Sequence, residues 1–324
     1  MTLNTDPNYS QAPSVPELEA LGLHHLYGGK VRDIYAVNDD QLLLVASDRI
    51  SAYDVIMSEA IPEKGAVLNG ISAYWFENTK DIITNHVVST DATDFPFTGA
   101  SELLHARSVL VQKTLPIRLE AIVRGYIFGH GYSEYLETGQ IHGHQLREGL
   151  RLSEKLPNPI FTPTSKAEEG HDESVSVEIA RDLVGAKVYD FIKDASIALY
   201  EYGVKRANDV GIILADTKFE FGFIANSDGA LSGGKSESSI DDIILIDEAM
   251  TPDSSRYWES STYSVGISPA SFDKQFLRDW LEAQPWDKTA PAPTLPQDVI
   301  FGTRERYVEA YERITGDSFS SWVG

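Results

Sequence analysis

One stretch decides how this chain folds: Ile212-Ile213-Leu214-Ala215-Asp216-Thr217-Lys218-Phe219-Glu220-Phe221-Gly222. Its apolar beginning passes into strict alternation, which places Asp216, Lys218 and Glu220 on one face of a β-strand. Alternate residues of a strand lie roughly 6.6 Å apart, so the ammonium group would lie between two carboxylates. Such a row could reach a polyanionic ligand and its metal. The alternative is an ordinary half-buried strand with a solvated charged face.

A second acidic strand favours the functional interpretation. The apolar run 243–246 leads directly to Asp247 and Glu248. If the two strands pair as an antiparallel hairpin, Glu220 and Asp247 can converge on one hard cation. We predict Mg²⁺, because it prefers one or two carboxylates plus phosphate oxygens. The chain has no cysteine, and its eight histidines lack zinc-ligand spacing, so a zinc site is not expected.

Composition sets limits on the class of protein. A length of 324 residues allows about two domains, and 42% apolar residues are typical of a soluble globular protein. We expect a cytoplasmic protein, because the sequence shows no signal peptide, no membrane span and no cysteine. A net charge of -22 opposes binding to nucleic acid or an anionic membrane. Any anion site must therefore be built from local cations.

A glycine turn opens the first predicted sheet. The run 26–37 reads as a hairpin around Gly28, Gly29 and Lys30, and a third strand follows at 41–45. Glycine lets backbone amides approach a phosphate, and Lys30 would add a point charge. The pattern matches neither the Walker motif nor the dinucleotide fingerprint. Taken alone, it favours a plain hairpin turn.

Further along the chain, charged residues lie among apolar ones. Glu120 and Arg124 belong to an apolar strand, where a structural salt bridge is the usual explanation. Residues 149–173 read as an irregular segment, either a substrate lid or a solvated connection. We expect helices at 67–78, at 179–208, from Ser268 to about Pro285, and at the C-terminus before Gly316.

These motifs together resemble those of the phosphoribosylaminoimidazole-succinocarboxamide synthase (SAICAR synthetase) family, in its long, fungal-like form. The resemblance runs from about His24 to about Ile314. It rests on several separate motifs in the family's order: Gly29-Lys-Val-Arg-Asp-Ile-Tyr35, Ser47-Asp-Arg-Ile-Ser-Ala-Tyr-Asp54, Glu120-Ala-Ile-Val-Arg-Gly-Tyr126, Lys166-Ala-Glu-Glu-Gly-His-Asp-Glu173, Asp216-Thr-Lys-Phe-Glu-Phe-Gly222, Asp247-Glu248, Thr251-Pro-Asp-Ser-Ser-Arg256 and Ser271-Phe-Asp-Lys-Gln-Phe-Leu-Arg-Asp-Trp280.

The resemblance implies an ATP-dependent ligase of purine biosynthesis that joins L-aspartate to carboxyaminoimidazole ribonucleotide (CAIR) and releases ADP and phosphate. It implies ATP and Mg²⁺ as cofactors, and a monomer. The implied catalytic residues are Lys218, Asp216 and Lys30, and the implied metal ligands are Glu220 and Asp247. The implied ATP-binding residues are Gly28, Gly29, Lys30, Arg32, Lys113 and Glu120. The implied substrate-binding residues are Ser51, Asp54, Arg124, His130, Lys166, His171, Asp172, Asp253 and Arg256.

One position departs from the family pattern. After Gly129 the family usually carries Ser, whereas this chain has His130. We expect the imidazolium form of His130 to bind the substrate phosphate, with a solvent-facing side chain as the alternative.

Two other functions fit parts of the sequence. A small-molecule or protein kinase would also combine a glycine turn with metal-binding strands, but the chain lacks the Asp-Phe-Gly and His-Arg-Asp motifs. A catalytically inactive nucleotide-binding regulator is disfavoured, because the charged positions that the chemistry needs are present.

We expect an α+β fold in two lobes with antiparallel or mixed sheets, related through the family to kinase and ATP-grasp architecture. ATP would lie in the cleft, since pockets usually form between lobes. The expected divisions are a flexible arm at 1–20, an ATP-binding lobe at 21–118, a central substrate- and metal-binding lobe at 119–263, and a C-terminal helical segment at 264–324 packed on the lobes.

Overall fold

The computed structural model describes residues 12–97, 101–165, 173–224 and 240–324. Helices and antiparallel sheets are mixed along the chain, so the predicted α+β class is confirmed. The chain forms two compact units. The first unit contains Met1–Tyr74, His86–Lys113 and Phe272–Gly324, and the second contains Trp75–Asn85 and Thr114–Ser271.

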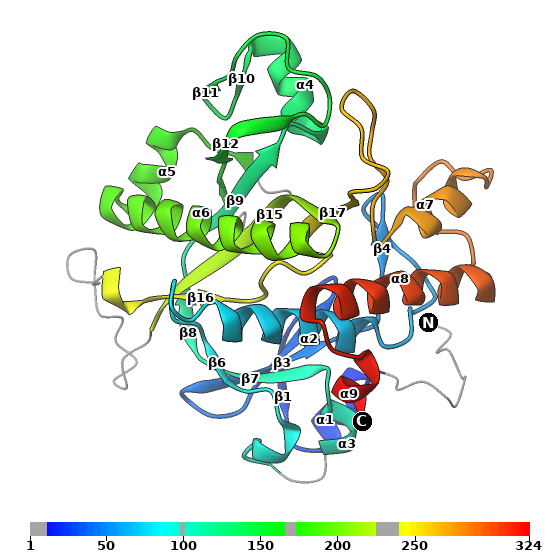
Figure 1. Ribbon diagram of the computed structural model, residues 1–324. Helices are drawn as coiled ribbons and strands as arrows, with labels where there is room; N and C mark the ends of the chain where they lie inside the picture. Colours follow the sequence, from blue (N-terminus) through cyan, green and yellow to red (C-terminus); the bar gives the residue numbers. More distant parts are fainter. Residues whose placement is uncertain (1–11, 98–100, 166–172, 225–239) are drawn as a thin grey trace. The chain divides into compact units, whose positions relative to one another are not determined.

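The first unit is built on a five-stranded antiparallel sheet with the order β1-β2-β3-β7-β6. The predicted glycine turn joins its first two strands, and the predicted third strand lies beside them (Figure 1). A separate two-stranded hairpin, β4–β5, follows the sheet's third strand. The strand bounds are β1 His24–Gly28, β2 Arg32–Ala36, β3 Gln41–Ala46, β4 Ser51–Ala52, β5 Val55–Ile56, β6 Val87–Ser89 and β7 Ser108–Gln112.

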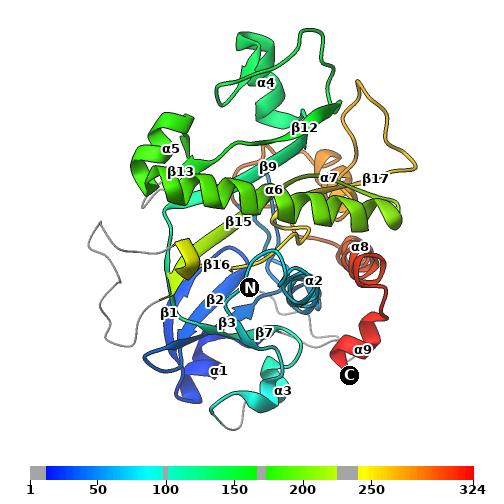
Figure 2. The same ribbon diagram turned by 60° about the vertical axis from the view of Figure 1, so that its left-hand side comes forward.

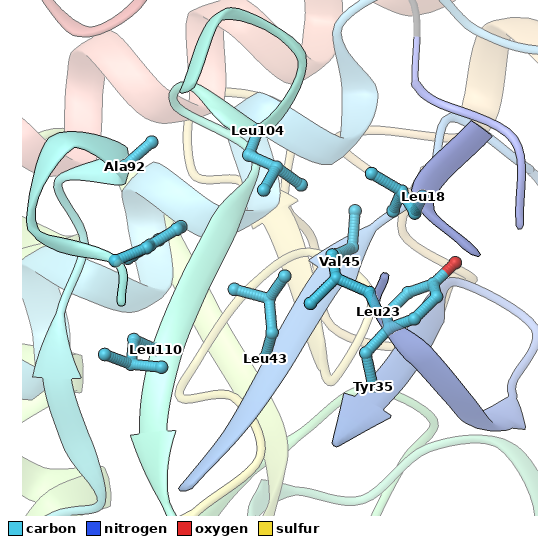
Figure 3. Packing of buried hydrophobic residues seen from close by; sticks show 9 residues of the cluster. Leu18, Leu23, Tyr35, Leu43, Val45, Ala92, Leu104 and Leu110 are labelled. Carbon is cyan, nitrogen blue, oxygen red and sulfur yellow. The ribbon is translucent and has the colours of Figure 1, made fainter. Parts of the chain in front are cut away.

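Alternating apolar residues of β2, β3 and β7 form the core of this unit. Tyr35, Leu43, Val45 and Leu110 point to one side of the sheet, where Leu104 also lies (Figure 3). Short helical segments cover this side: α1 Val15–Ala20, η1 Ala92–Asp94 and α3 Ser101–Leu104.

The C-terminal helices belong to the same unit. Helices α8 and α9 pack on helix α2, Lys64–Asn78, whose first part lies in this unit, and α7 packs on α8 (Figure 2). They are α7 Gln275–Glu282, α8 Gln297–Thr315 and α9 Phe319–Val323. The Trp322 indole donates to the Ala66 carbonyl at 3.0 Å. Gly70 is required by close approach, since a Cβ there would lie 2.6 Å from the Tyr311 ring. As predicted, Gly316 ends α8 in the left-handed conformation.

The second unit is built on an eight-stranded sheet around a long central strand, β15, Ile212–Ile224. This strand pairs antiparallel with β8, β9, β16 and β17, so it is surrounded by hydrogen-bonded neighbours along its length. The other bounds are β8 Thr114–Pro116, β9 Leu119–Tyr126, β12 Lys155–Phe161, β13 Thr164–Ser165, β14 Glu173–Ser174, β16 Ile243–Ile246 and β17 Ser255–Glu259.

Helix α6, Ala186–Asp209, crosses β9 and β15 and covers one face of this sheet (Figures 1 and 2). Phe219 and Phe221 are fully buried, whereas Asp216, Lys218 and Glu220 lie on the opposite face, as the alternation predicts. A smaller layer is formed by α4, Gly129–Thr138, with the hairpin β10–β11, Gln140–Ile141 and His144–Gln145. None of the helices in the described ranges is long and apolar enough to cross a membrane.

Three local expectations were wrong. The segment 149–173 was expected to be irregular, but β12 and β13 lie within it and pair with β9, with a register irregularity between Lys155 and Ile160 where the prolines fall. The expected helix 179–208 is divided into α5, Val177–Val184, and α6, because Gly185 has a φ of 89°. The helix expected from Ser268 begins at Gln275. A turn at 272–274 precedes it, and Phe272 of this turn is buried and lies against the Arg306 and Arg313 side chains of α8.

Candidate active site

Four charged side chains of the second unit meet around the Lys218 ammonium and form what we call the acidic cluster. Lys218 Nζ lies 3.1 Å from Glu120 Oε1, 2.5 Å from Glu220 Oε1 and 4.0 Å from Asp247 Oδ2. The strands explain the arrangement. Glu220 pairs with the residue before Asp247 in the β15–β16 ladder, which confirms the predicted antiparallel pairing. Glu120 enters from β9 on the other side and also accepts a bond of 3.1 Å from Thr164 Oγ1.

Lys218 stays charged in this environment. Burial lowers the pKa of its ammonium group, but the carboxylates of Glu220, Asp247 and Glu120 outweigh that effect and raise the pKa above its usual value. The side chain is still 26% exposed, so it remains accessible to a ligand.

A second group, the arginine cluster, adjoins the acidic cluster on the same face of the sheet. Asp216 Oδ2 accepts from Arg124 Nη1 at 3.1 Å and from Arg256 Nη1 at 2.5 Å. The register produces this geometry, because Asp216 lies opposite Arg124 on β9 and opposite Arg256 on β17. Arg124 is held further by its Nε bond of 3.0 Å to Thr162 Oγ1, and the Arg256 guanidinium lies over the Phe128 ring.

The two clusters have opposite formal charge. One ammonium against three carboxylates leaves the acidic cluster at -2, and two guanidiniums against one carboxylate leave the arginine cluster at +1. One end of the row therefore attracts a cation, and the other attracts a phosphate or carboxylate, which guanidinium binds in a bidentate fork.

The acidic cluster fits the magnesium ion that the sequence implies. Glu220 and Asp247 provide two carboxylates at neighbouring strand ends, and Mg²⁺ is commonly held by one or two carboxylates together with substrate phosphates. No group of three or more histidine or acidic side chains in the described ranges is arranged to hold a metal by itself. A magnesium ion here would therefore depend on phosphate oxygens for its remaining ligands.

In the first unit the glycine turn has a rigid backbone. Gly29 N–H donates to the Arg32 carbonyl at 2.7 Å. Neither Gly28 nor Gly29 has a positive φ, so close approach is what favours glycine here. A Cβ on Gly28 would lie 3.0 Å from the Asp33 carboxylate, and one on Gly29 would lie 3.1 Å from the Arg32 carbonyl.

Arg49 links this turn to the segment that carries Ser51 and Asp54. Its guanidinium donates to the Gly29 carbonyl at 2.8 Å and pairs with Asp33 at 3.1 Å. Lys30 Nζ lies 3.6 Å from Asp54 Oδ1, and both side chains are largely exposed. The structure thus brings together Gly28, Gly29, Lys30 and Asp54, which the sequence had placed in two separate motifs, and Ser51 lies on β4 three residues before Asp54.

Lys113 does not join this group. It follows β7, and its N–H donates to the Asp40 carbonyl at the far end of β2 and β3 from the glycine turn. The four residue steps from Arg32 to Ala36 separate the two ends by roughly 14 Å of strand. Because β7 runs antiparallel to β3, its end necessarily lies where β3 begins.

The remaining predicted residues of the second unit that the structure describes lie at the start of α4 and in the turn before β17. His130 is exposed in the first turn of α4, and Asp253 lies in the turn that leads into β17, where its N–H donates to Thr251 Oγ1 at 3.3 Å. Lys166, His171 and Asp172 lie outside the described residues.

Comparison with known proteins identifies the family. The SAICAR synthetase family model matches residues 25–293. The chain belongs to the SAICAR synthetase family. A SAICAR synthetase relative from Maridesulfovibrio salexigens, named phosphoribosylaminoimidazole-succinocarboxamide synthase, is 47% identical over 93% of this chain and 97% of its own length. One from Geobacter sulfurreducens, with the same name, is 50% identical over 89% of this chain and 93% of its own length.

Solved SAICAR synthetase structures share the fold. The structure titled "SAICAR-synthase from Saccharomyces cerevisiae complexed SAICAR" is 43% identical, with a TM-score of 0.82 over 91% of this chain and 96% of that one. A type-2 SAICAR synthetase in complex with ADP is 24% identical, with a TM-score of 0.61 over 90% of this chain and 98% of that one, and supports the fold alone. The greater likeness to the yeast protein agrees with the predicted long, fungal-like form.

Sequence reasoning missed several residues that shape this SAICAR synthetase site. Thr162 orients Arg124, and Arg49 braces the glycine turn. Arg49 lies within a quoted motif and Thr162 lies four residues before another, but only the folded strands show which partners they reach. Glu120 was predicted to bind ATP, and the structure adds that its carboxylate lies against Lys218; its role at ATP stays a prediction.

Proposed function

We propose that this chain makes SAICAR from CAIR, L-aspartate and ATP, with the acidic and arginine clusters as the centre of the reaction. It is an ATP-dependent carbon–nitrogen ligase of purine biosynthesis. The observation that carries the division of roles is the row of side chains from β9, β15 and β17, negative at one end and positive at the other.

In the first step an oxygen of the CAIR carboxylate attacks the γ-phosphorus of ATP. The bond from that phosphorus to the β,γ-bridging oxygen breaks, and ADP leaves with the bond's electron pair. The product is an acyl phosphate. Phosphoryl transfer depends on positioning and on neutralising charge at the equatorial oxygens. Lys218 provides a positive charge, and Asp216 holds Arg124 and Arg256, which would bind the CAIR phosphate and the aspartate carboxylates.

Magnesium would be held by Glu220 and Asp247 and would neutralise phosphate oxygens of ATP. The glycine turn, with Gly28, Gly29 and Lys30, would add backbone amides and an ammonium group, and Arg32 would add a guanidinium. Lys113 would contact another part of ATP, because its backbone lies away from the glycine turn.

In the second step the amine of L-aspartate attacks the acyl carbon. The carbon–oxygen bond to phosphate breaks, phosphate leaves, and the nitrogen loses a proton as the amide forms. No covalent bond to the protein is needed. Arg124 and Arg256 suit the nucleotide phosphate and the aspartate carboxylates. The other proposed substrate contacts are Ser51, Asp54, His130, Lys166, His171, Asp172 and Asp253.

We also propose that the enzyme is a cytoplasmic monomer. Its complete lack of cysteine suits a reducing compartment, and its likeness to the yeast structure supports the long form of the family. The kinase alternative is not favoured, because both the relatives and the solved structures are SAICAR synthetases.

A coupled assay of ADP formation tests this function, with each substrate omitted in turn. We expect full turnover only with ATP, CAIR and L-aspartate together. ADP formed at an undiminished rate without aspartate and without CAIR would contradict the ligase assignment and would support a phosphotransferase acting on another acceptor.

A further inference from the structure

A β-bulge lies in β15 immediately before Asp216. Leu214 lies opposite Tyr257 on β17, and Asp216 lies opposite Arg256, which leaves Ala215 as an extra residue. Neighbouring side chains of β17 point to opposite faces, so Leu214 and Asp216 must also lie on opposite faces although they are two residues apart. Without the bulge, the charged row would point to the face that Leu214 occupies.

The Tyr200 side chain forms a hydrogen bond to this bulge from the face of the sheet that α6 covers. Tyr200 lies on α6, is 3% exposed, and donates from Oη to the Leu214 carbonyl at 2.8 Å, with the Ala215 carbonyl at 3.3 Å. Gly125 on β9 lies against the same oxygen, because a Cβ built on this glycine would lie 2.0 Å from Tyr200 Oη. The hydroxyl group therefore lies between β9 and β15.

The Tyr200 hydroxyl lies where the hydrogen-bonded ladder between β9 and β15 ends. The paired residues run from Phe219 and Ala121 to Asp216 and Arg124, and the next residues are the bulged Ala215 and Gly125. Gly125 is required by contact, because a Cβ there would lie 2.0 Å from Tyr200 Oη. The hydroxyl thus occupies the place of the next rung of the ladder, directly beside the pair formed by Asp216 and Arg124.

We propose that Tyr200 is a positioning residue of the ligase: its hydroxyl joins β9 to the β15 bulge and thereby fixes Asp216 between Arg124 and Arg256. The inference rests on the proposed function of the arginine cluster. It assigns a role in substrate binding to a side chain on the covered face of the sheet, which itself touches no substrate.

The test is Tyr200→Phe, which removes one oxygen and leaves the ring. A buried carbonyl then loses its partner and the bulge relaxes, so the Asp216 carboxylate shifts. We expect kcat/KM for CAIR to fall about 10- to 100-fold, because a misplacement of 1 Å costs on the order of 10² in rate. Hydrogen exchange of the amide of Gly125 should also accelerate.

Tyr189→Phe is the matched control. Tyr189 lies on the same helix and is equally buried, but its ring packs against Phe161 of β12. We expect this variant to keep wild-type kinetic constants. Turnover by the wild type and by this control tests the proposed function by itself, so a failure of that function is distinguishable from a failure of the inference.

A second variant, Gly125→Ala, displaces the hydroxyl instead of removing it. It should produce the same loss for CAIR. The double variant Gly125→Ala/Tyr200→Phe has no hydroxyl, so the 2.0 Å contact is gone, and the next ring atom lies 2.9 Å from the new Cβ. The losses of kcat/KM for CAIR from the two substitutions should therefore be clearly less than additive. Additive losses, or a Tyr200→Phe enzyme that melts earlier but keeps normal kcat and KM, would overturn the proposal in favour of a purely structural tyrosine.

Discussion

Replacing Lys218 by Met removes the ammonium group from the acidic cluster and is the most informative single substitution in the site. The methionine keeps a similar length and volume, so the surrounding strands can retain their packing. What changes is the charge: the cluster goes from -2 to -3 where the phosphates of ATP are proposed to bind. The effect on turnover should therefore exceed the effect on folding.

The size of the kinetic effect follows from the geometry. A unit charge about 4 Å from a developing charge is worth about 4 kcal/mol at an effective dielectric constant of 20. Each 1.36 kcal/mol corresponds to about tenfold in rate, which gives an upper value of about 10³. Lys218 already shares its charge with carboxylates at 2.5 and 3.1 Å, so we expect kcat to fall by about 10² or somewhat more.

Stability should change less. The three remaining carboxylates repel one another. Glu120 and Glu220 are largely buried, but Asp247 is 30% exposed, so a cation from solution can reach the cluster and offset part of the repulsion. We expect a loss of about 1 kcal/mol, or roughly 2–4 °C in Tm if each unit unfolds as a domain of its size. The assay is steady-state ADP formation with calorimetry of the same preparations, and Lys205→Met, an exposed lysine on α6, is the control.

The reasoning about Lys218 would be refuted by one pattern of results. If Lys218→Met melts far below the wild type while the folded fraction turns over at the normal rate, the lysine is a structural charge that neutralises its neighbours. Lys218→Arg should fall between the wild type and Lys218→Met, because it keeps the charge but not the compact ammonium group.

The remaining predictions concern the metal, the departure from the family pattern and the packing of the first unit. Glu220→Gln and Asp247→Asn should each lower turnover at ordinary magnesium and raise the magnesium concentration needed for half-maximal rate. Near-normal activity of Glu220→Gln would contradict the assignment. If His130 binds the substrate phosphate, His130→Ala should raise KM for CAIR, and His130→Ser should raise it less without abolishing turnover, because the hydroxyl keeps a hydrogen bond; an unchanged KM in both variants would make His130 a bystander. Gly65→Ala should destabilise the enzyme by about 2 kcal/mol, because its Cβ would lie 2.4 Å from the Ala46 backbone oxygen. Gly302→Ala should cost less, since the Phe276 ring that it meets is 46% exposed and can turn away; equal losses in Tm would contradict this.

Much of the site could be predicted from the sequence, because its residues follow strand periodicity. The alternation in β15 fixes the face of Asp216, Lys218 and Glu220, and the acidic end of β16 suggests the antiparallel pairing with Glu220. These are short-range patterns that the backbone geometry of a strand imposes.

The rest depends on contacts that sequence spacing does not encode. Glu120 reaches Lys218 only because β9 lies beside β15, and the choice of Arg49 as the brace of the glycine turn depends on how two hairpins fold together. The bulge at Ala215 is hidden for a similar reason. The bulge changes the face to which the following side chains point. It lies within a run of apolar residues that are buried on both faces, so the sequence there has no alternation that could reveal the change.

The fate of one oxygen atom tests the central claim most directly. The reaction can be run with CAIR whose carboxylate carries ¹⁸O, and the phosphate released can be examined by mass spectrometry. Attack by the carboxylate on the γ-phosphorus places one carboxylate oxygen in the released phosphate, so we predict one ¹⁸O atom in each phosphate for every SAICAR formed. Formation of SAICAR with unlabelled phosphate would contradict the acyl phosphate route.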